Sequence, residues 1–164
     1  MLYYSVNTYL KIIFFISSIS IISAFFIEYI LGHQPCNLCI LERIPHGLSI
    51  ILIIFNYFLR KNEQFIILLL ILIFSFSFII SFYHFGIEQG VFEESVVCVL
   101  KDASNIISKE ELLKQLQEKA VSCKDVTFRI FGFSLTTINI IISLFLTIIL
   151  TKIFLNYGKF KNQN

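Results

Sequence analysis

Residues 65–85 read FIILLLILIFSFSFIISFYHF and contain no Asp, Glu, Lys or Arg. The hydrocarbon core of a bilayer requires roughly 20 apolar residues for each spanning helix. Three further runs of this kind lie at about 12–31, 44–59 and 133–155. Spanning strands are excluded because an open strand leaves its backbone unsatisfied in lipid, and no alternating barrel pattern is present. We therefore expect an all-α integral membrane protein, a bundle of four transmembrane helices.

The composition of the whole chain supports the same class. Of 164 residues, 57% are hydrophobic and 15% are charged, whereas a soluble domain is about 25% charged. The mean hydropathy is +0.82. A net charge of +2 without a basic stripe excludes a nucleic-acid-binding protein. The length suits one membrane domain, residues 1–164. The first apolar run is too long for a signal peptide and lacks an A-x-A site, so we expect it to remain as a span.

One long polar segment, residues 86–132, separates the third and fourth runs. Its net charge is −2, and the rest of the chain carries +4. Within it, the sequence from Ser108 to Glu111 resembles a capping box. The residues that follow share one face of a helix: Leu112, Leu113, Leu116 and Ala120. We expect a short amphipathic loop helix here. It lies either against the membrane surface or the other loop, or it is exposed to solvent on all sides.

The cysteines are confined to one side of the predicted membrane. With four spans, the loops at about 32–43 and 86–132 share a side, and both termini share the other. Six basic residues on the terminal side and seven on the loop side leave the orientation undecided. All four cysteines lie in the two loops: Cys36, Cys39, Cys98 and Cys123. Disulfides persist in oxidising compartments, so we expect these loops in the periplasm of a bacterium and the termini in the cytoplasm.

The first two cysteines form a CxxC motif whose surroundings favour redox chemistry. Pro35 suits the first turn of a helix, which places Cys36 and Cys39 on one face, one turn apart. A helix N-terminus favours thiolate over thiol, and Arg43, one turn further on, adds positive charge. Four cysteines allow three pairings. A zinc site is disfavoured because Cys98 and Cys123 lack the short ligand spacing, whereas two purely structural disulfides remain an alternative.

The stretch Pro35-Cys36-Asn37-Leu38-Cys39-Ile40-Leu41-Glu42-Arg43 resembles the disulfide bond formation protein B (DsbB) family. Two further stretches resemble a subset of that family, Arg43-Ile44-Pro45-His46 and the segment from Tyr83 to Gly90 ahead of Cys98. The resemblance extends from the first span to the fourth. The chain departs from the family in having no Trp and in placing Glu93-Glu94 where a Pro/Gly turn is usual. These departures concern the shape of the loop.

The resemblance implies a membrane thiol oxidase with a defined role for each cysteine. A soluble thioredoxin-like oxidant of the DsbA type would attack Cys98 and form a mixed disulfide with it. Cys123, the disulfide partner of Cys98, would pass the electrons to Cys36. Cys39 would be the thiolate that meets a membrane quinone, either ubiquinone or menaquinone. Arg43 would hold the quinone carbonyl and stabilise the negative charge that develops on it.

The position of the basic residues agrees with a quinone site at the membrane edge. A reduced oxygen in a low-dielectric site requires a cation, and an ionisable residue within a span indicates a functional site. The alternative for Arg43 is a snorkelling anchor. His46 and His84 are candidates for protonating a reduced quinone, and His33 for tuning the CxxC pair, although each also suits interfacial packing. Pro45 is interpreted as the start of the second helix.

Other functions fit parts of the same pattern. A dedicated paralogue of the DsbB family, serving one special partner, would share every motif. A four-helix enzyme similar to vitamin K epoxide reductase also uses CxxC, but late in its chain and without the Glu42-Arg43 pair found here. A membrane scaffold with structural disulfides, or a metal-binding protein, belongs to a different class. We expect no metal cofactor.

Overall fold

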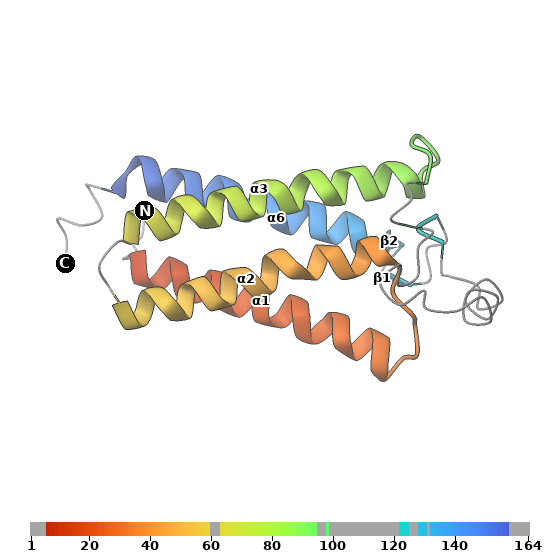
Figure 1. Cartoon of the computed structure of the whole chain (residues 1–164), viewed down its shortest axis with the longest axis horizontal. Helices are drawn as coiled ribbons and strands as arrows, with labels where there is room; N and C mark the ends of the chain where they lie inside the picture. The colour runs from red at the N-terminus through yellow and green to blue at the C-terminus, as the bar shows by residue number, and fades with distance from the viewer. Residues whose placement is uncertain are drawn as a thin grey trace, which may run out of the picture.

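The computed structural model describes residues 6–59, 63–94, 98, 122–124, 128–130 and 132–157. The elements in chain order are α1 (Val6–Tyr29), α2 (Asn37–Leu59), α3 (Glu63–Glu88), β1 (Arg129–Ile130), β2 (Phe133–Ser134) and α6 (Leu135–Leu155). The helices run side by side, and β1 and β2 lie at one end of the bundle (Figure 1). Within these residues four helices are long and apolar enough to cross a membrane, which confirms the predicted class. The predicted loop helix near 108–120 lies outside the described residues.

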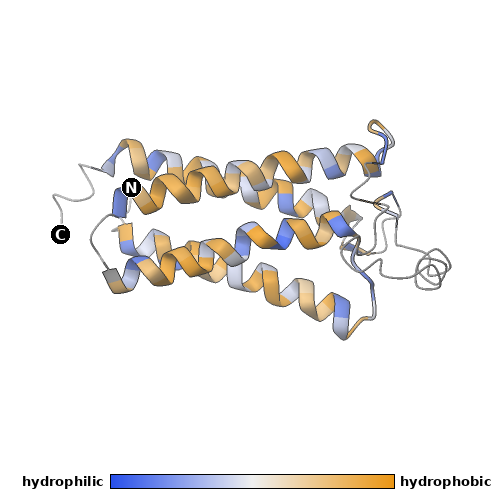
Figure 2. Ribbon diagram, viewed as in Figure 1, coloured by the Kyte–Doolittle hydropathy of each residue, from blue (hydrophilic) through white to orange (hydrophobic). Residues whose placement is uncertain are grey.

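The bundle is apolar inside and outside. Phe74, Leu70 and Leu146 are fully buried where α3 packs against α2 and α6. Large apolar side chains also cover the outer faces, for example Phe58 at 81% exposure and Ile22 at 66%. Figure 2 shows hydrophobic residues along the length of the helices. Apolar outer faces of this extent are unfavourable in water and favourable against lipid chains.

Small polar residues allow the helices to approach closely. Ser49 on α2 donates a hydrogen bond to Ser17 on α1, with 2.9 Å between the two Oγ atoms. Ser77 on α3 and Ser143 on α6 are joined in the same way at 3.0 Å. All four serines are fully buried. Small side chains with satisfied hydroxyls are typical of contacts between transmembrane helices, where lipid offers no alternative hydrogen-bond partner.

The second helix begins earlier than the hydropathy indicated. It starts at Asn37, close to the helix start that Pro35 and the CxxC spacing predict, whereas the apolar run begins only near residue 44. Residues 37–43 of the expected loop at 32–43 are therefore helical. Pro45 lies inside α2, which overturns its interpretation as the helix start. Hydropathy underestimates the length of this helix at its N-terminal end, because Glu42 and Arg43 are charged. The backbone hydrogen bonding of the helix nevertheless continues through both residues. The connection from α1 turns at Gly32, whose φ of +72° favours glycine.

A short hairpin, formed by the two-residue strands β1 and β2, precedes the last helix. Arg129 pairs with Ser134 and Ile130 with Phe133 in an antiparallel arrangement. Ser134 then caps α6, because its Oγ accepts a hydrogen bond from the backbone N–H of Thr137 at 3.2 Å. The first turn of α6 lies beside the end of α3, where Thr136 donates a hydrogen bond to the Glu88 Oε1.

Candidate functional site

The CxxC motif opens helix α2. Cys36 immediately precedes the helix, and Cys39 lies in its first turn. Their Sγ atoms are 2.7 Å apart without a disulfide bond, and the backbone N–H of Cys39 donates to the Cys36 Sγ at 3.3 Å. The predicted arrangement, two cysteines on one face at a helix N-terminus, is confirmed. A thiol placed in this way has a backbone donor that stabilises its anion.

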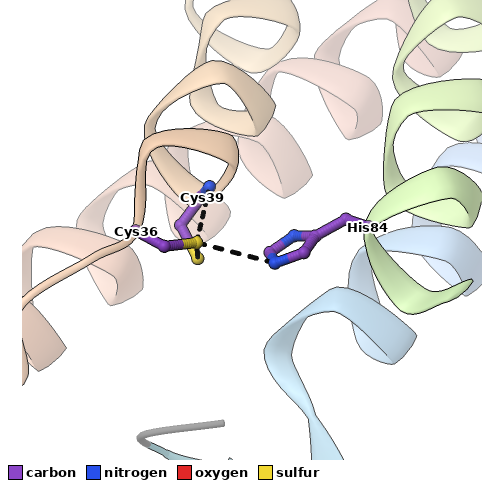
Figure 3. Close-up of side chains that lie close together, drawn as sticks. All are labelled: Cys36, Cys39 and His84. Atoms are coloured by element: carbon purple, nitrogen blue, oxygen red, sulfur yellow. Dashed lines mark hydrogen bonds between the residues drawn. The ribbon is translucent and has the colours of Figure 1, made fainter. Parts of the chain in front are cut away.

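His84 on α3 completes the immediate surroundings of the thiols. Its Nε2 lies 3.5 Å from the Cys36 Sγ, and Figure 3 shows the ring pointing at the cysteine pair. Its Nδ1 lies 2.8 Å from the Glu42 Oε1 on α2. His84 is 2% exposed and Glu42 is 8% exposed. The structure thus aligns a thiol, an imidazole and a carboxylate, an arrangement that favours an ionised sulfur beside a fixed ring.

Further buried polar residues connect this cluster to α6. Asn139 donates through Nδ2 to the Glu42 Oε2 at 3.2 Å and to the Ser81 Oγ at 2.8 Å. Its Oδ1 lies 2.9 Å from the Nε2 of His46. Because an amide oxygen only accepts, the Nε2 of His46 carries the hydrogen. The Nδ1 of His46 is buried without a hydrogen-bond partner in the described part of the chain.

The surroundings of Cys36 stabilise its thiolate. Hydrogen bonds with the Cys39 thiol and with His84 lower the pKa of Cys36 to about 5, although burial acts in the opposite direction. A thiol with an ordinary pKa near 8.5 is mostly protonated at neutral pH. Cys36 is therefore ionised at neutral pH and becomes protonated only as the pH falls through about 5.

We expect alkylation of Cys36 by iodoacetamide to stay near its maximal rate from neutral pH down to about pH 6, because the thiolate persists there. In the His84→Gln protein the half-maximal rate should move to higher pH, since the imidazole hydrogen bond is lost. Mass spectrometry of the reduced full-length protein would follow the modified peptide. A profile for Cys36 with the pH dependence of a free thiol would contradict this prediction.

The second cysteine pair lies against the first. Cys98 and Cys123 form a disulfide, one of the three pairings that the sequence allowed. Both are buried at 2% exposure in an apolar cluster that also contains Cys36, Leu38 and Ile87. Two cysteine pairs from distant parts of the chain therefore meet in one cluster. This proximity is a requirement for thiol–disulfide exchange between them.

A cavity of about 340 Å³ lies beside the CxxC motif. Residues of α1, α2 and α6 line it, and most of its wall is apolar. Cys39, Arg43 and His46 are among the lining residues, whereas Cys36 and His84 are not. Of the three residues predicted to bind a cofactor, two reach this cavity. The third, His84, contacts the thiol of Cys36 instead.

Arg43 is held in place at the cavity wall by α1. Its Nη1 donates to the Glu28 Oε2 at 2.5 Å, and its Cζ lies 5.2 Å from the centroid of the Phe25 ring. Both contacts fix the guanidinium. The sequence argument that Arg43 stabilises a thiolate receives no support from these contacts, because the group hydrogen-bonded to Cys36 is His84.

The family model described as disulfide bond formation protein DsbB matches residues 7–153. This chain belongs to the DsbB family. The protein RP370 of Rickettsia prowazekii (strain Madrid E), which is described as uncharacterized, is 29% identical over 141 residues, covering 82% of this chain and 80% of that protein. No solved structure matches the chain. Membership of the DsbB family indicates an oxidoreductase of disulfide bond formation, and four spanning helices make it a multi-pass membrane protein.

Several residues of this DsbB-family site were not singled out from the sequence. Glu28 pairs with Arg43, Asn139 bridges Glu42 and His46, and Thr136 donates to the Glu88 Oε1 at 2.6 Å. The available signal was polarity within apolar spans, which marks functional positions in membrane helices. His33, proposed to tune the CxxC pair, lines the cavity and packs its ring 5.1 Å from that of Phe128.

Proposed function

We propose that this protein is a thiol oxidase of the bacterial inner membrane. It reoxidises a soluble thioredoxin-like dithiol of the DsbA type and passes the two electrons to a membrane quinone. The observation that carries the proposal is that the CxxC pair contacts both the loop disulfide and the cavity. Both cysteines pack in the cluster of the Cys98–Cys123 disulfide, and Cys39 also lines the cavity, whereas Cys36 does not. One cysteine pair can therefore take electrons on one side and release them on the other.

Electrons enter by thiolate attack on a disulfide. A thiolate of the soluble partner attacks Cys98, which breaks the bond to Cys123 and leaves the Cys123 sulfur as a thiolate. The Cys123 thiolate then attacks Cys36 of an oxidised CxxC pair and releases the Cys39 thiolate. The second thiol of the partner resolves its bond to Cys98 and leaves oxidised. Cys98 then attacks Cys123, restores the loop disulfide and releases the Cys36 thiolate.

At the end of these steps the Cys98–Cys123 disulfide is restored, and the two electrons reside on the CxxC pair. A bound quinone supplies the acceptor for two electrons and two protons. Formation of the Cys36–Cys39 bond accompanies its reduction to quinol. The net reaction converts one dithiol and one quinone into one disulfide and one quinol, with electrons and protons balanced.

The cavity fits a quinone head group in size and chemistry. Its volume of about 340 Å³ lies at the lower end of the range for small-molecule pockets. The apolar wall suits the ring, and Arg43 offers guanidinium N–H donors beyond the one used by Glu28. His46 lines the same cavity, and its Nδ1 has no hydrogen-bond partner among the described residues. We assign Arg43 to the quinone oxygen and His46 to proton delivery.

His84 has a different role in this proposal from the one expected from the sequence. Its Nε2 faces Cys36, and Glu42 fixes the opposite nitrogen. In that position His84 stabilises the Cys36 thiolate each time Cys36 leaves a disulfide. Glu42 orients the ring, because its two oxygens are held by His84 and Asn139. Glu42 is therefore a positioning residue, whereas His84 touches a reacting sulfur.

Replacing Arg43 with alanine should raise the KM for quinone by roughly 10–100-fold, the range expected for losing a hydrogen bond from a charged group. The KM for the dithiol partner should change little, because the cavity and the loop disulfide are separate. Steady-state quinone reduction at varied concentrations of each substrate would measure both values. Lys152→Ala removes a basic residue at the opposite end of α6 and serves as the control. A larger change in the KM for the dithiol would contradict the assignment.

The cysteine-bearing end of the bundle faces the periplasm in this proposal, and both termini face the cytoplasm. Thiol exchange with a soluble oxidant requires both loops in the oxidising compartment. Fusions of the full chain to reporters active on only one side of the membrane test this orientation. A C-terminal reporter active in the periplasm would contradict it.

A further inference from the structure

We propose that the reduced CxxC pair and His84 form a binding site for a thiophilic divalent cation such as Zn²⁺. A metal bound there holds the pair reduced and blocks the electron path. The binding of metal follows from the donor groups alone. Only its inhibitory consequence rests on the proposed thiol oxidase function.

Three donor atoms converge at this point. The Sγ atoms of Cys36 and Cys39 and a ring nitrogen of His84 all lie within 4.8 Å of one another. Zinc bonds to sulfur at about 2.3 Å and to nitrogen at about 2.0–2.1 Å, so its tetrahedral donors lie roughly 3.5–3.8 Å apart. The separation of 3.5 Å between the Cys36 Sγ and the His84 Nε2 matches this spacing. The two sulfurs, at 2.7 Å, must separate by about 1 Å, which small side-chain rotations provide.

The histidine is already oriented as a metal ligand. Histidines that bind metals usually donate their second ring nitrogen to a carboxylate, which fixes the tautomer and strengthens the ligand. The Nδ1 of His84 lies 2.8 Å from the Glu42 Oε1, which leaves the Nε2 facing the thiols. Glu42 is in turn held by Asn139. Glu42 therefore orients the imidazole toward the proposed metal.

A buried carboxylate stands beside the three donors. The Glu88 side chain is 6% exposed, and its Oε1 lies 4.0 Å from the Nε2 of His84. Its Oε2 has no hydrogen-bond partner in the described part of the chain. An incompletely paired carboxylate is costly to bury, and a nearby divalent cation offsets that cost. Glu88 is accordingly the candidate for the fourth ligand, or for a countercharge close to the metal.

Metal binding at this site is an exchange of protons for metal. Any thiol proton still on Cys36 or Cys39 is released to water, two sulfur–metal bonds form, and no electron moves. A Cys36–Cys39 disulfide offers no thiolate, so only the reduced pair binds. Metal and disulfide formation therefore compete for the same two sulfurs. The bound cation keeps the electrons on the pair and withholds Cys39 from the cavity.

The direct test is a titration of the reduced full-length protein with Cd²⁺ in detergent, under anaerobic conditions and without quinone or thiol donor. The Cys98→Ser/Cys123→Ser protein is used, so that CxxC supplies all the thiols. We expect one Cd²⁺ per chain, detected by thiolate-to-metal charge-transfer absorption and displaced by Zn²⁺. Glu42→Gln should weaken binding by about 10–100-fold, and His84→Ala at least as much. Glu63→Gln, the same change of side chain at the opposite end of α3 from His84, should bind like its parent.

Absence of the absorption band from the reduced protein, or equal affinity in the His84→Ala and Glu63→Gln proteins, would overturn the site. If the double variant does not fold, the wild-type protein is alkylated with and without Zn²⁺. Mass spectrometry then shows whether Zn²⁺ protects Cys36 and Cys39 from alkylation. Unprotected cysteines there overturn it equally. Metal binding without inhibition of turnover refutes the inhibitory consequence. Absence of turnover in metal-free protein refutes the thiol oxidase function and leaves the metal result standing.

Discussion

The Cys39→Ser protein is expected to lose quinone-dependent turnover by about three orders of magnitude or more, as enzymes do when a reacting group is removed. Cys39 is the CxxC cysteine that lines the cavity. A hydroxyl there cannot join Cys36 in a disulfide, so the electron pair has no route to the acceptor. Anaerobic quinone reduction by purified protein, followed by absorbance with a reduced DsbA-type dithiol as donor, measures the effect.

The same variant contains its own control. Its Cys98–Cys123 disulfide is untouched, so it should oxidise about one equivalent of the dithiol once and then stop. That single round distinguishes loss of the quinone step from failure to fold. Steady turnover at the wild-type rate would refute the division of labour between Cys36 and Cys39. If the wild-type protein shows no turnover with either ubiquinone or menaquinone, one of two other functions is favoured. These are a dedicated paralogue that serves another partner, and a membrane scaffold with structural disulfides.

Replacing Cys123 with serine should trap a covalent complex with the soluble partner. The Cys98 thiol, freed of its disulfide, attacks the disulfide of an oxidised thioredoxin-like partner, and the Cys123 thiol that would displace that partner is absent. We expect the Cys123→Ser protein to form at least about tenfold more of the intermolecular adduct than the wild-type protein does. A non-reducing gel detects it as a band at the combined mass, which disappears when reductant is added.

The matched control is Cys98→Ser, which retains Cys123 and should give little or no adduct. Cys98 and Cys123 are each 2% exposed in the cluster with Cys36 and Ile87, so capture requires the cluster to open. Adduct formation should therefore be slower than exchange with an exposed disulfide. If the Cys123→Ser protein forms no adduct with any thioredoxin-like oxidant, the partner assigned here is wrong.

The sequence alone determined the membrane class and the chemistry of the motif. Apolar runs near 20 residues predict spanning helices because burial in lipid depends on local composition. The position of Cys36 and Cys39 on one face at the start of a helix followed from a spacing of three residues, which is also local. The position of Arg43 and His46 on the face shared with Cys39 followed from the same periodicity, and all three line one cavity.

The tertiary structure decided how these local pieces meet. Three kinds of contact join residues far apart in the chain: the hydrogen bond between His84 and Cys36, the network through Glu42 and Asn139, and the pairing of Cys98 with Cys123. Such contacts depend on the packing and rotation of α2, α3 and α6, which hydropathy and spacing leave free. For the same reason the sequence placed His84 with the quinone. Packing of α3 against α2 turned it toward the thiols instead.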